Sequence, residues 1–358
     1  MWPECQALRE LDSRTAVRPP SRWGGVQVGD GRGGPVARVR DTEVERLVTT
    51  VAWLYHTKNM RQSAIAERLG ISQSRVSRLL DQAVSMGIVR TIVVLPDSAH
   101  SVLESELESA YGLREAHVYD LGDTADDAQL VRELGQLLAL HLQSSPLDAE
   151  VIGLTSWSRS LGETVRSLQP VRTSTARTVV EMLGDVGPPR LQHEAAQVTQ
   201  QLAHLTGASP MFLRIPGVTP SPEVRRTLLE HNPHAREALR MLDQVELALV
   251  GIGAGRIVPP LQGGENFFTA EQFERARAAG AVAEINLRFI AEDGSPVVTE
   301  LDELVVGATL EQVRRAERRL GVAGGPAKYR SIRAALLGGW VNCLVTDSRT
   351  ARYLIEHR

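Results

Sequence analysis

The feature that most constrains the fold is an alternation of strand-like and helix-like segments from about residue 100 onward. Short apolar stretches have the character of strands at 116–121, 150–155, 178–183, 210–215, 246–252, 281–290 and 341–346. Helix-length stretches lie between them, at 126–144, 190–206, 270–279, 309–319 and 327–337. Strands that alternate with helices in this way form parallel sheets through crossover connections. We therefore predict an α/β domain with an open sheet over residues 97–358, in which 292–297 form a turn within an antiparallel excursion.

The preceding segment has a purely helical pattern. Apolar residues at helical spacing predict a first helix, which begins at Asp41 or Thr42 and ends at Lys58-Asn59: Val44, Leu47, Val48, Val51, Leu54 and Tyr55. A second helix, QSAIAERLG, ends at Gly70, and a third begins after Ser72 and ends at Gly87. The β-branched stretch IVRTIVVL then suits a short strand or wing. Residues 41–96 are thus predicted to form a winged helix-turn-helix domain.

The remaining composition bounds the class of protein. Residues 1–40 are rich in glycine, proline and arginine without periodicity, so we expect a mostly disordered tail. The two cysteines, Cys5 and Cys343, lie far apart and outside any metal-type cluster, which indicates a reducing compartment without disulfides. No apolar run is long enough to span a bilayer, and the N-terminus lacks a signal-peptide core. We expect a cytoplasmic protein with no membrane partner and no metal or cofactor.

The third predicted helix carries the polar side chains that bind DNA in other proteins. With Val76, Leu79, Leu80 and Ala83 facing inward, its outer side presents Gln73, Ser74, Arg75, Ser77 and Arg78. Arginine can form a bidentate contact with guanine, and glutamine can pair with adenine. Residues 46–90 hold seven lysines and arginines against two acidic residues, which leaves +5 in a chain whose net charge is -3.

Double-stranded DNA is therefore the predicted partner of this module. Arg61, Gln62 and Ser63, at the start of the second helix, and Arg90 are placed to contact phosphates. Because one such unit reads only a few base pairs, we expect at least a dimer on a pseudo-palindromic operator. The alternative is a three-helix module that docks on another protein and keeps a solvated basic face.

The chain resembles the SorC-type sugar-responsive transcriptional regulators. The resemblance rests on VAWLYHTKNMRQSAIAERLGISQSRVSRLLDQAVSMGIVRTIVV, VIGLTSWSRSLGETV, LVGIGAG, GAVAEINLRFIAEDGSPV and GVAGGPAKYRSIRAALLGGWVNCLVTDSRTARYL, in family order over about residues 43–358. It implies an effector domain with the fold of sugar-phosphate isomerases and deaminases. It also implies a homotetramer whose DNA affinity responds to a sugar, a polyol or a phosphorylated sugar.

One loop has the composition of an anion site, independently of the resemblance. EVIGLT predicts a buried strand and RSLGETVRSL the next helix, and backbone N–H groups at such a helix start bind anions. The candidate ligand-binding residues of this loop are Thr155, Ser156, Trp157, Ser158 and Ser160, with Arg159 adding charge. Helix capping by serine accounts for one of these hydroxyl groups, but not for all four.

Further candidates lie elsewhere in the chain. Glu284 is an acid in the middle of an apolar strand and matches the family's acidic residue; alternatively it faces water on an edge strand. Lys328 resembles the family's effector lysine, although an exposed helical lysine is usually solvated. Arg256 follows a glycine-rich turn and can reach a phosphate, but a tight turn explains the glycines equally well. Gln192 and His193 open a helix that could reach the same crevice.

The loops depart from the family pattern at two places. The family has glycine after the tryptophan and threonine two positions later, where this chain has Ser158 and Ser160. The family's double glycine is Gly184-Asp185 here, which makes one corner of the site more polar. The first change disfavours close approach of the backbone to a phosphate, so a non-phosphorylated effector remains open.

Two other classes of function compete with a ligand-controlled regulator. A sugar-phosphate isomerase or deaminase with a DNA-binding appendage would need a general base, for which Glu284 or Lys328 could serve. The sequence shows no Asp-His pairing, metal-ligand cluster or nucleophile elbow, so we predict a regulator and no enzyme. A scaffold or sigma-like protein would show no ligand response at all.

Overall fold

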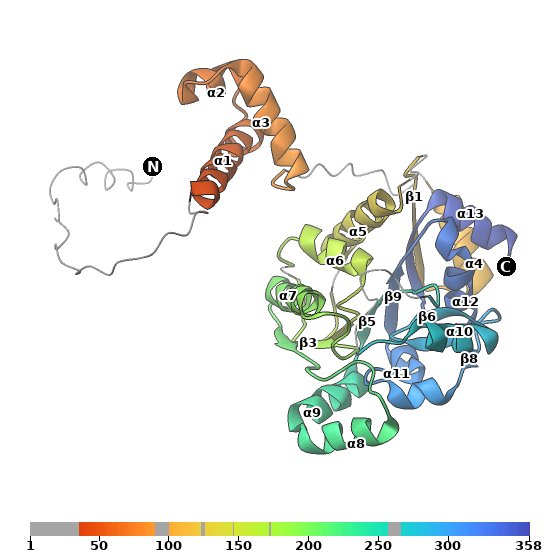
Figure 1. Cartoon of the computed structure of the whole chain (residues 1–358). Helices are drawn as coiled ribbons and strands as arrows, with labels where there is room; N and C mark the ends of the chain where they lie inside the picture. Colours follow the sequence, from red (N-terminus) through yellow and green to blue (C-terminus); the bar gives the residue numbers. More distant parts are fainter. Residues whose placement is uncertain (1–35, 90–99, 123–125, 146, 172, 257–265) are drawn as a thin grey trace, which may run out of the picture. The chain divides into compact units, whose positions relative to one another are not determined.

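The computed structural model describes residues 36–89, 100–122, 126–145, 147–171, 173–256 and 266–358. The chain divides into two compact units, residues 1–92 and 93–358 (Figure 1). Residues 1–35 of the tail predicted over 1–40, and the predicted wing from Arg90 onward, lie outside the described residues, whereas residues 36–40 of that tail belong to a helix. No described helix is both long enough and apolar enough to cross a bilayer.

The N-terminal unit consists of packed helices. They are α1 (Val36–Ala52), the π-helical turn η1 (Trp53–Thr57), α2 (Gln62–Leu69) and α3 (Gln73–Ser85). Their shared core contains Val48, Val51, Leu54, Ile65, Val76, Leu79, Leu80 and Ala83. The predicted inner face of α3 is thus buried, and the module holds together through one apolar cluster.

Two details of the first helix differ from the prediction. Helix α1 begins at Val36 rather than at Asp41, since residues 36–41 contain no glycine or proline to stop it. Val44 and Tyr55 are exposed and do not belong to the buried stripe. A π-turn follows α1, with the Lys58 N–H donating to Trp53 O, and this wider turn rotates Tyr55 out of the 3.6-residue register.

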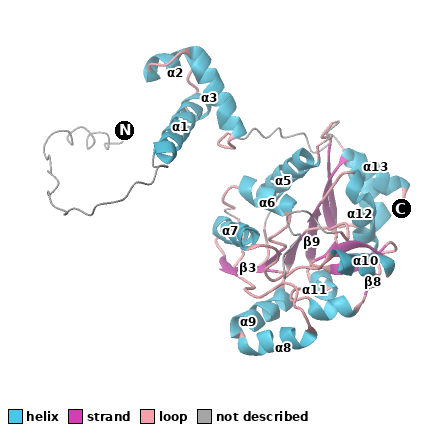
Figure 2. Cartoon of the chain, in the orientation of Figure 1, coloured by secondary structure: helices cyan, strands magenta, loops and turns pink. Residues whose placement is uncertain are grey.

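The C-terminal unit is built on a parallel sheet, whose strands are magenta in Figure 2. The sheet has seven strands in the order β1-β10-β9-β5-β2-β3-β4. The strands are β1 (Glu115–Tyr119), β2 (Val151–Leu154), β3 (Thr178–Glu181), β4 (Ser209–Met211), β5 (Leu247–Val250), β9 (Arg318–Val322) and β10 (Cys343–Asp347). Every residue of β2, β5 and β10 is buried, as expected for central strands covered on both faces. The predicted α/β class with an open parallel sheet is confirmed.

Helices cover both faces of this sheet (Figure 1). One face packs against α5 (Asp127–Ser144), α6 (Arg159–Ser167) and α7 (Pro189–Thr206). The other packs against α4 (Ser101–Tyr111), α9 (Pro233–Met241), α11 (Leu310–Arg315), α12 (Tyr329–Leu337) and α13 (Ser348–Glu356). Helix α8 (Pro222–His231) precedes α9, in a stretch for which the sequence predicted no element.

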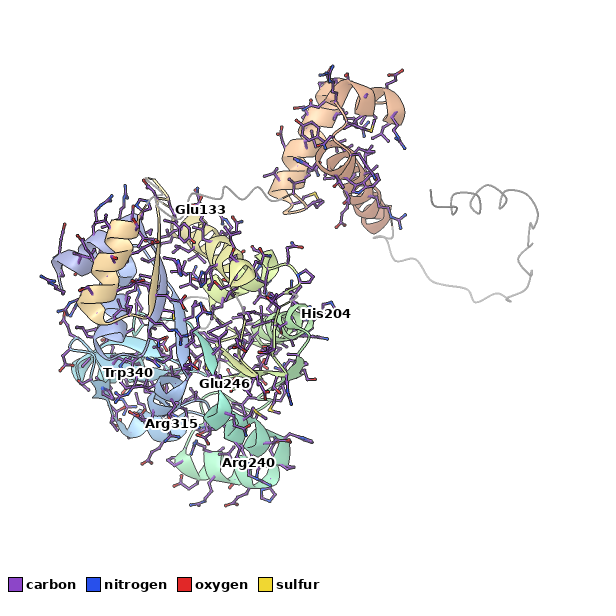
Figure 3. The ribbon with its side chains drawn as sticks, turned by 180° about the vertical axis from the view of Figure 1, so that it is seen from behind. Glu133, His204, Arg240, Glu246, Arg315 and Trp340 are labelled. Atoms are coloured by element: carbon purple, nitrogen blue, oxygen red, sulfur yellow. The ribbon has the colours of Figure 1, made fainter. Side chains whose placement is uncertain are left out.

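A small antiparallel sheet follows β5 along the chain. It contains β6 (Ala281–Ile285), β7 (Arg288–Ala291) and β8 (Pro296–Val297), and its phenylalanine-rich core includes α10 (Ala270–Ala278). The single strand predicted over 281–290 is wrong: Asn286 and Leu287 both have positive φ and turn the chain into a hairpin. Trp340, labelled in Figure 3, is buried and donates its indole N–H to Gly294 O at 2.8 Å. This bond joins the turn between β7 and β8 to the segment between α12 and β10.

Edge strand β1 is protected by side chains of α4. Its outward N–H groups at Ala116 and Val118 donate to carboxylates of Glu108 and Glu104, at 3.0 and 2.9 Å. Unpaired edge N–H groups would otherwise offer a template for another strand. The sheet therefore ends at β1 through polar contacts within the same chain.

Candidate nucleic-acid interface and effector site

The turn between α2 and α3 is closed at both ends by local hydrogen bonds. Gly70 adopts a left-handed conformation (φ 63°), and its N–H donates to the last carbonyls of α2. The Ser72 hydroxyl accepts the Arg75 N–H at 3.2 Å and so caps α3, as the sequence predicted. These two contacts fix the start of α3 relative to α2.

Helix α3 presents the predicted polar face to solvent. Gln73, Ser74, Arg75 and Arg78 are exposed, and Ser77 is half-buried. The Arg78 Nε donates to Ser74 O at 3.3 Å, which leaves the ends of its guanidinium group available. At the start of α2, Arg61 and Ser63 are exposed and Gln62 is half-buried. The eight candidate DNA-binding residues therefore form two neighbouring groups at helix starts, a position from which side chains reach base edges and phosphates.

The sheet of the C-terminal unit has a switch point between β2 and β5. From β2 the chain continues to β3 and β4 on one side, whereas from β5 it continues to β9 and β10 on the other. In open α/β sheets, ligands bind outside the carboxyl ends of such strands. Thr155 follows β2 and Gly251 follows β5, so the predicted loop lies at this position.

The loop after β2 combines buried and available hydroxyl groups. Thr155 is buried and donates its hydroxyl to Asn286 Oδ1 at 2.9 Å. Ser156 and Ser160 are also buried. Ser158 is the N-cap residue of α6, yet its side chain makes no capping bond. Simple helix capping therefore does not explain Ser158, and its hydroxyl remains available at a helix N-terminus.

The loop after β5 contacts both neighbouring segments through glycines. A Cβ added to Gly251 would lie 2.9 Å from Ser158 Cβ, and one added to Gly253 would lie 1.7 Å from Glu284 Oε1. Gly253 and Glu284 also exchange backbone hydrogen bonds of 2.9 and 3.1 Å. These glycines are required because any side chain would occupy space that Ser158 and Glu284 already fill.

Glu284 and Lys328 form the charged centre of the site. The Glu284 side chain accepts the Leu287 N–H at 2.9 Å, and the half-buried Lys328 donates its Nζ to Ile252 O at 2.7 Å. Burial raises the pKa of Glu284 to about 7, although the Leu287 N–H and the charge of Lys328 act to lower it. Glu284 is buried, so the alternative that it faces water on an edge strand is wrong.

Charged groups of both signs surround Lys328. Burial lowers the pKa of Lys328, the nearby charges of Arg159 and Arg256 lower it further, and Glu284 and Asp127 oppose this. Arg159 and Arg256 are themselves exposed. An anion bound among these groups would relieve the repulsion between the three cations and favour the charged form of Lys328.

Other predicted residues have local partners. The Trp157 ring packs edge-to-face with Phe267, and its buried N–H has no partner among the described residues. Gln192 donates to Gly187 O at 2.8 Å, and His193 is exposed. Asp185 pairs with Arg214 at 2.7 Å, which places an ion pair at the corner where the family pattern has glycine.

The sequence analysis missed Asn286. This residue is buried, accepts the Thr155 hydroxyl, and has an amide nitrogen with no partner among the described residues. A buried amide nitrogen without a partner calls for an explanation, and this one lies beside the candidate ligand groups. Its only sequence signal is an asparagine within an apolar stretch, which suggests a left-handed turn position.

Comparisons with known proteins agree with this layout. The family model described as "Putative sugar-binding domain" matches residues 98–356. The deoxyribonucleoside regulator of Bacillus subtilis is 31% identical over 316 residues, which cover 88% of this chain and 99% of the relative. The sorbitol operon regulator of Klebsiella pneumoniae is 28% identical, with 87% and 98% covered. The crystal structure of full-length SorC from the same species superposes with a TM-score of 0.63, at 28% identity, over 88% of this chain and 99% of that one. This chain belongs to the SorC-type family of sugar-binding transcriptional regulators.

Proposed function

We propose that this protein binds an operator through α2 and α3 and that a small carbohydrate, bound at the switch point, controls its operator affinity. The observation that carries the proposal is that Ser158, Glu284 and Lys328 each adjoin the loop 251–253, which follows β5, while the Ser158 side chain makes no capping bond. Hydroxyl and carboxylate groups suit sugar hydroxyls, and the cations around Lys328 suit a phosphate. The candidate effectors are therefore sugars, polyols and sugar phosphates.

The effector acts by preferring one arrangement of the subunits. A ligand shifts an equilibrium only by its difference in affinity for the two states. A coupling of about 1–3 kcal/mol changes operator affinity about 5–150-fold. We propose a homotetramer, a dimer of dimers, in which paired α3 helices bind a pseudo-palindromic site; light scattering measures this assembly directly.

Thermal unfolding against a panel of ligands tests the effector site. The panel contains pentoses, hexoses, polyols and their phosphates, and includes deoxyribonucleosides and sorbitol because those compounds appear in the names of relatives. A ligand at 100-fold above its dissociation constant adds about 2.7 kcal/mol, which a melting curve resolves. Lys328→Ala and Ser156→Ala should remove the shift, whereas Arg349→Ala, on α13, should retain it. A panel without any shift contradicts the carbohydrate proposal.

An enzymatic role is the competing function, because a carboxyl with a pKa of about 7 is suited to general base catalysis. However, Glu284 is held by the Leu287 N–H and packs against the Gly253 backbone. We propose that Glu284 binds a ligand hydroxyl and does not transfer a proton to carbon. Incubation of the effector with the protein in deuterated water tests this: deuterium exchange or turnover would establish the enzyme instead.

A further inference from the structure

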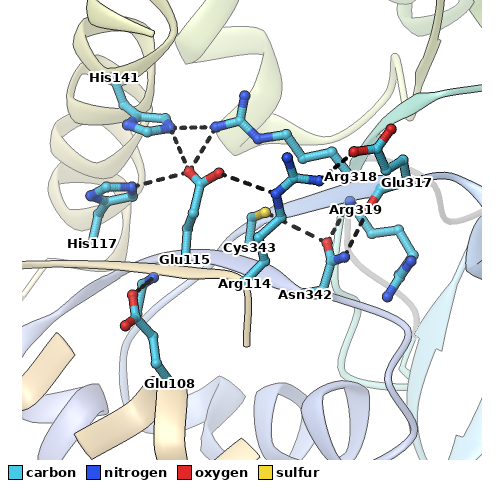
Figure 4. Close-up of polar contacts among 11 residues, drawn as sticks. Glu108, Arg114, Glu115, His117, His141, Glu317, Arg318, Arg319, Asn342 and Cys343 are labelled. Atoms are coloured by element: carbon cyan, nitrogen blue, oxygen red, sulfur yellow. Dashed lines mark hydrogen bonds and ion pairs between the residues drawn. The ribbon is translucent and has the colours of Figure 1, made fainter. Parts of the chain in front are cut away.

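A second polar cluster lies at the opposite end of the sheet from the effector site. Glu115, Arg318 and Cys343 are the first residues of β1, β9 and β10, so they mark the amino ends of the strands (Figure 4). Glu115 and His117 are alternate residues of β1 and share one face of the strand. His141 of α5 lies over that face, and its ring centroid is 4.0 Å from that of His117.

Three donor atoms of this cluster are spaced like the ligands of a metal ion. Glu115 Oε2 lies 3.6 Å from His117 Nε2 and 3.5 Å from His141 Nε2. All three donor atoms lie within 4.8 Å of one another, and this is the one such group found in the described part of the chain. Tetrahedral Zn²⁺ with nitrogen and oxygen ligands at about 2.0–2.1 Å places neighbouring donors about 3.3–3.4 Å apart. The observed separations need only small side-chain adjustments.

Both histidines direct a ring nitrogen toward Glu115. His117 Nε2 is buried and has no hydrogen-bond partner among the described residues, since Glu115 is too distant for a good bond. Unpaired buried nitrogens of this kind are rare and call for an explanation. His141 Nε2 accepts a hydrogen bond from Arg318, so its lone pair points into the cluster.

Arg318 already places a cation in this position. Its Nη2 lies 2.8 Å from Glu115 Oε2 and 2.9 Å from His141 Nε2, and thus contacts two of the three donor atoms. Its Nε is buried without a partner among the described residues, so the guanidinium group is not fully satisfied there. We propose that Glu115, His117 and His141 bind one Zn²⁺ ion, with water in the fourth position, and that the ion displaces the Arg318 guanidinium group.

Such an ion would join the edge of the sheet to a helix. Glu115 and His117 belong to the edge strand β1, whose outward N–H groups donate to carboxylates of α4, and His141 belongs to α5. An ion that binds the folded state raises its stability. We therefore expect Zn²⁺ to raise the melting temperature of the effector domain without any carbohydrate.

Calorimetric titration of the full-length, untagged chain with zinc chloride, after treatment with a chelator, tests the proposal. We expect one ion per chain and at least about 10-fold weaker binding in His117→Gln and His141→Gln. Arg318→Gln should bind more tightly, because it removes the competing cation; a purely structural role of Arg318 predicts no such gain. Cys343→Ser is the matched control for adventitious binding by the neighbouring thiol and should leave the affinity unchanged.

Circular dichroism of each variant establishes that it is folded, and the half-exposed His117 offers the substitution that disturbs the core least. Cobalt provides a second readout, because tetrahedral coordination by wild type gives visible absorption that His117→Gln should lose. Absence of saturable zinc binding to wild type would overturn the proposal. So would unchanged affinity in both histidine variants, or unchanged affinity in Arg318→Gln.

Discussion

Glu284→Gln isolates the pH dependence that one buried carboxyl imposes on the effector domain. The pKa of Glu284 is raised from 4.5 to about 7 in the folded chain, and burial is the main cause. The folded state thus binds this proton more tightly than the unfolded state. Its stabilising effect is complete below about pH 4.5 and is lost as the pH rises through about 7. The difference between the two pKa values corresponds to a change of about 3 kcal/mol in the free energy of unfolding between these pH limits.

Urea denaturation followed by circular dichroism, between about pH 4.5 and about pH 8, measures this effect. Glutamine retains an acceptor for the Leu287 N–H but does not titrate, so the free energy of unfolding of wild type should fall by about 3 kcal/mol relative to the variant. Glu292→Gln is the control: Glu292 is exposed, and its contact with Arg330 lowers its pKa, which gives a small dependence of opposite sign. A difference between wild type and Glu284→Gln that stays constant with pH would refute the assignment.

Three further substitutions test the packing and the interface. Gly253→Ala should lower the free energy of unfolding of the effector domain, measured in urea, by about 1–3 kcal/mol, because the added carbon overlaps Glu284 Oε1. In the control Gly162→Ala the added carbon has its nearest contact at 3.4 Å, so this variant should be as stable as wild type or more stable. Ser72→Ala should cost the N-terminal unit about 1 kcal/mol in a thermal melt, since it removes the cap of α3. In operator titrations, Arg78→Ala should weaken the binding free energy by about 1–3 kcal/mol and relax the preference for particular bases. Arg61→Ala should instead weaken binding to all DNA sequences alike and lower the slope of log affinity against log salt concentration by about 1. Equal behaviour of the two variants would contradict their assigned roles.

Local patterns in the sequence predicted the elements whose causes are local. The inner face of α3, its Ser72 cap and the left-handed Gly70 all follow from residues within one or two helical turns. The strands β2, β3 and β5 were predicted because central parallel strands are apolar runs bounded by polar loops. By contrast, β9 was missed: the helix predicted over 309–319 takes in its first two residues, Arg318 and Arg319, which follow a helical stretch without a break.

Features that depend on distant contacts had no local signal. The π-turn after α1 places Leu54 in the core shared with α2 and α3, and the Asn286-Leu287 turn lacks the glycine that usually marks a hairpin. The polar cluster of Glu115, His117 and His141 joins a strand to a helix 24 residues further along, and sequence inspection found no metal-type spacing there. Each of these features needs the tertiary fold to bring its parts together.

The position of Lys328 shows why the effector site could be predicted only in part. Its Nζ meets Ile252 O, 76 positions earlier in the chain, because β9 lies beside β5 and both strands end at the same edge of the sheet. No local pattern in the sequence determines that strand order, so the serine loop was predicted from its own residues, whereas Lys328 was predicted mainly through the family resemblance. Once β5 lies between β2 and β9, the segments that follow these strands must converge, and Ser158, Gly253 and Lys328 come together as a consequence of sheet topology. A substitution that disturbs the contact between β5 and β9 should therefore impair effector binding even though it touches none of the ligand groups.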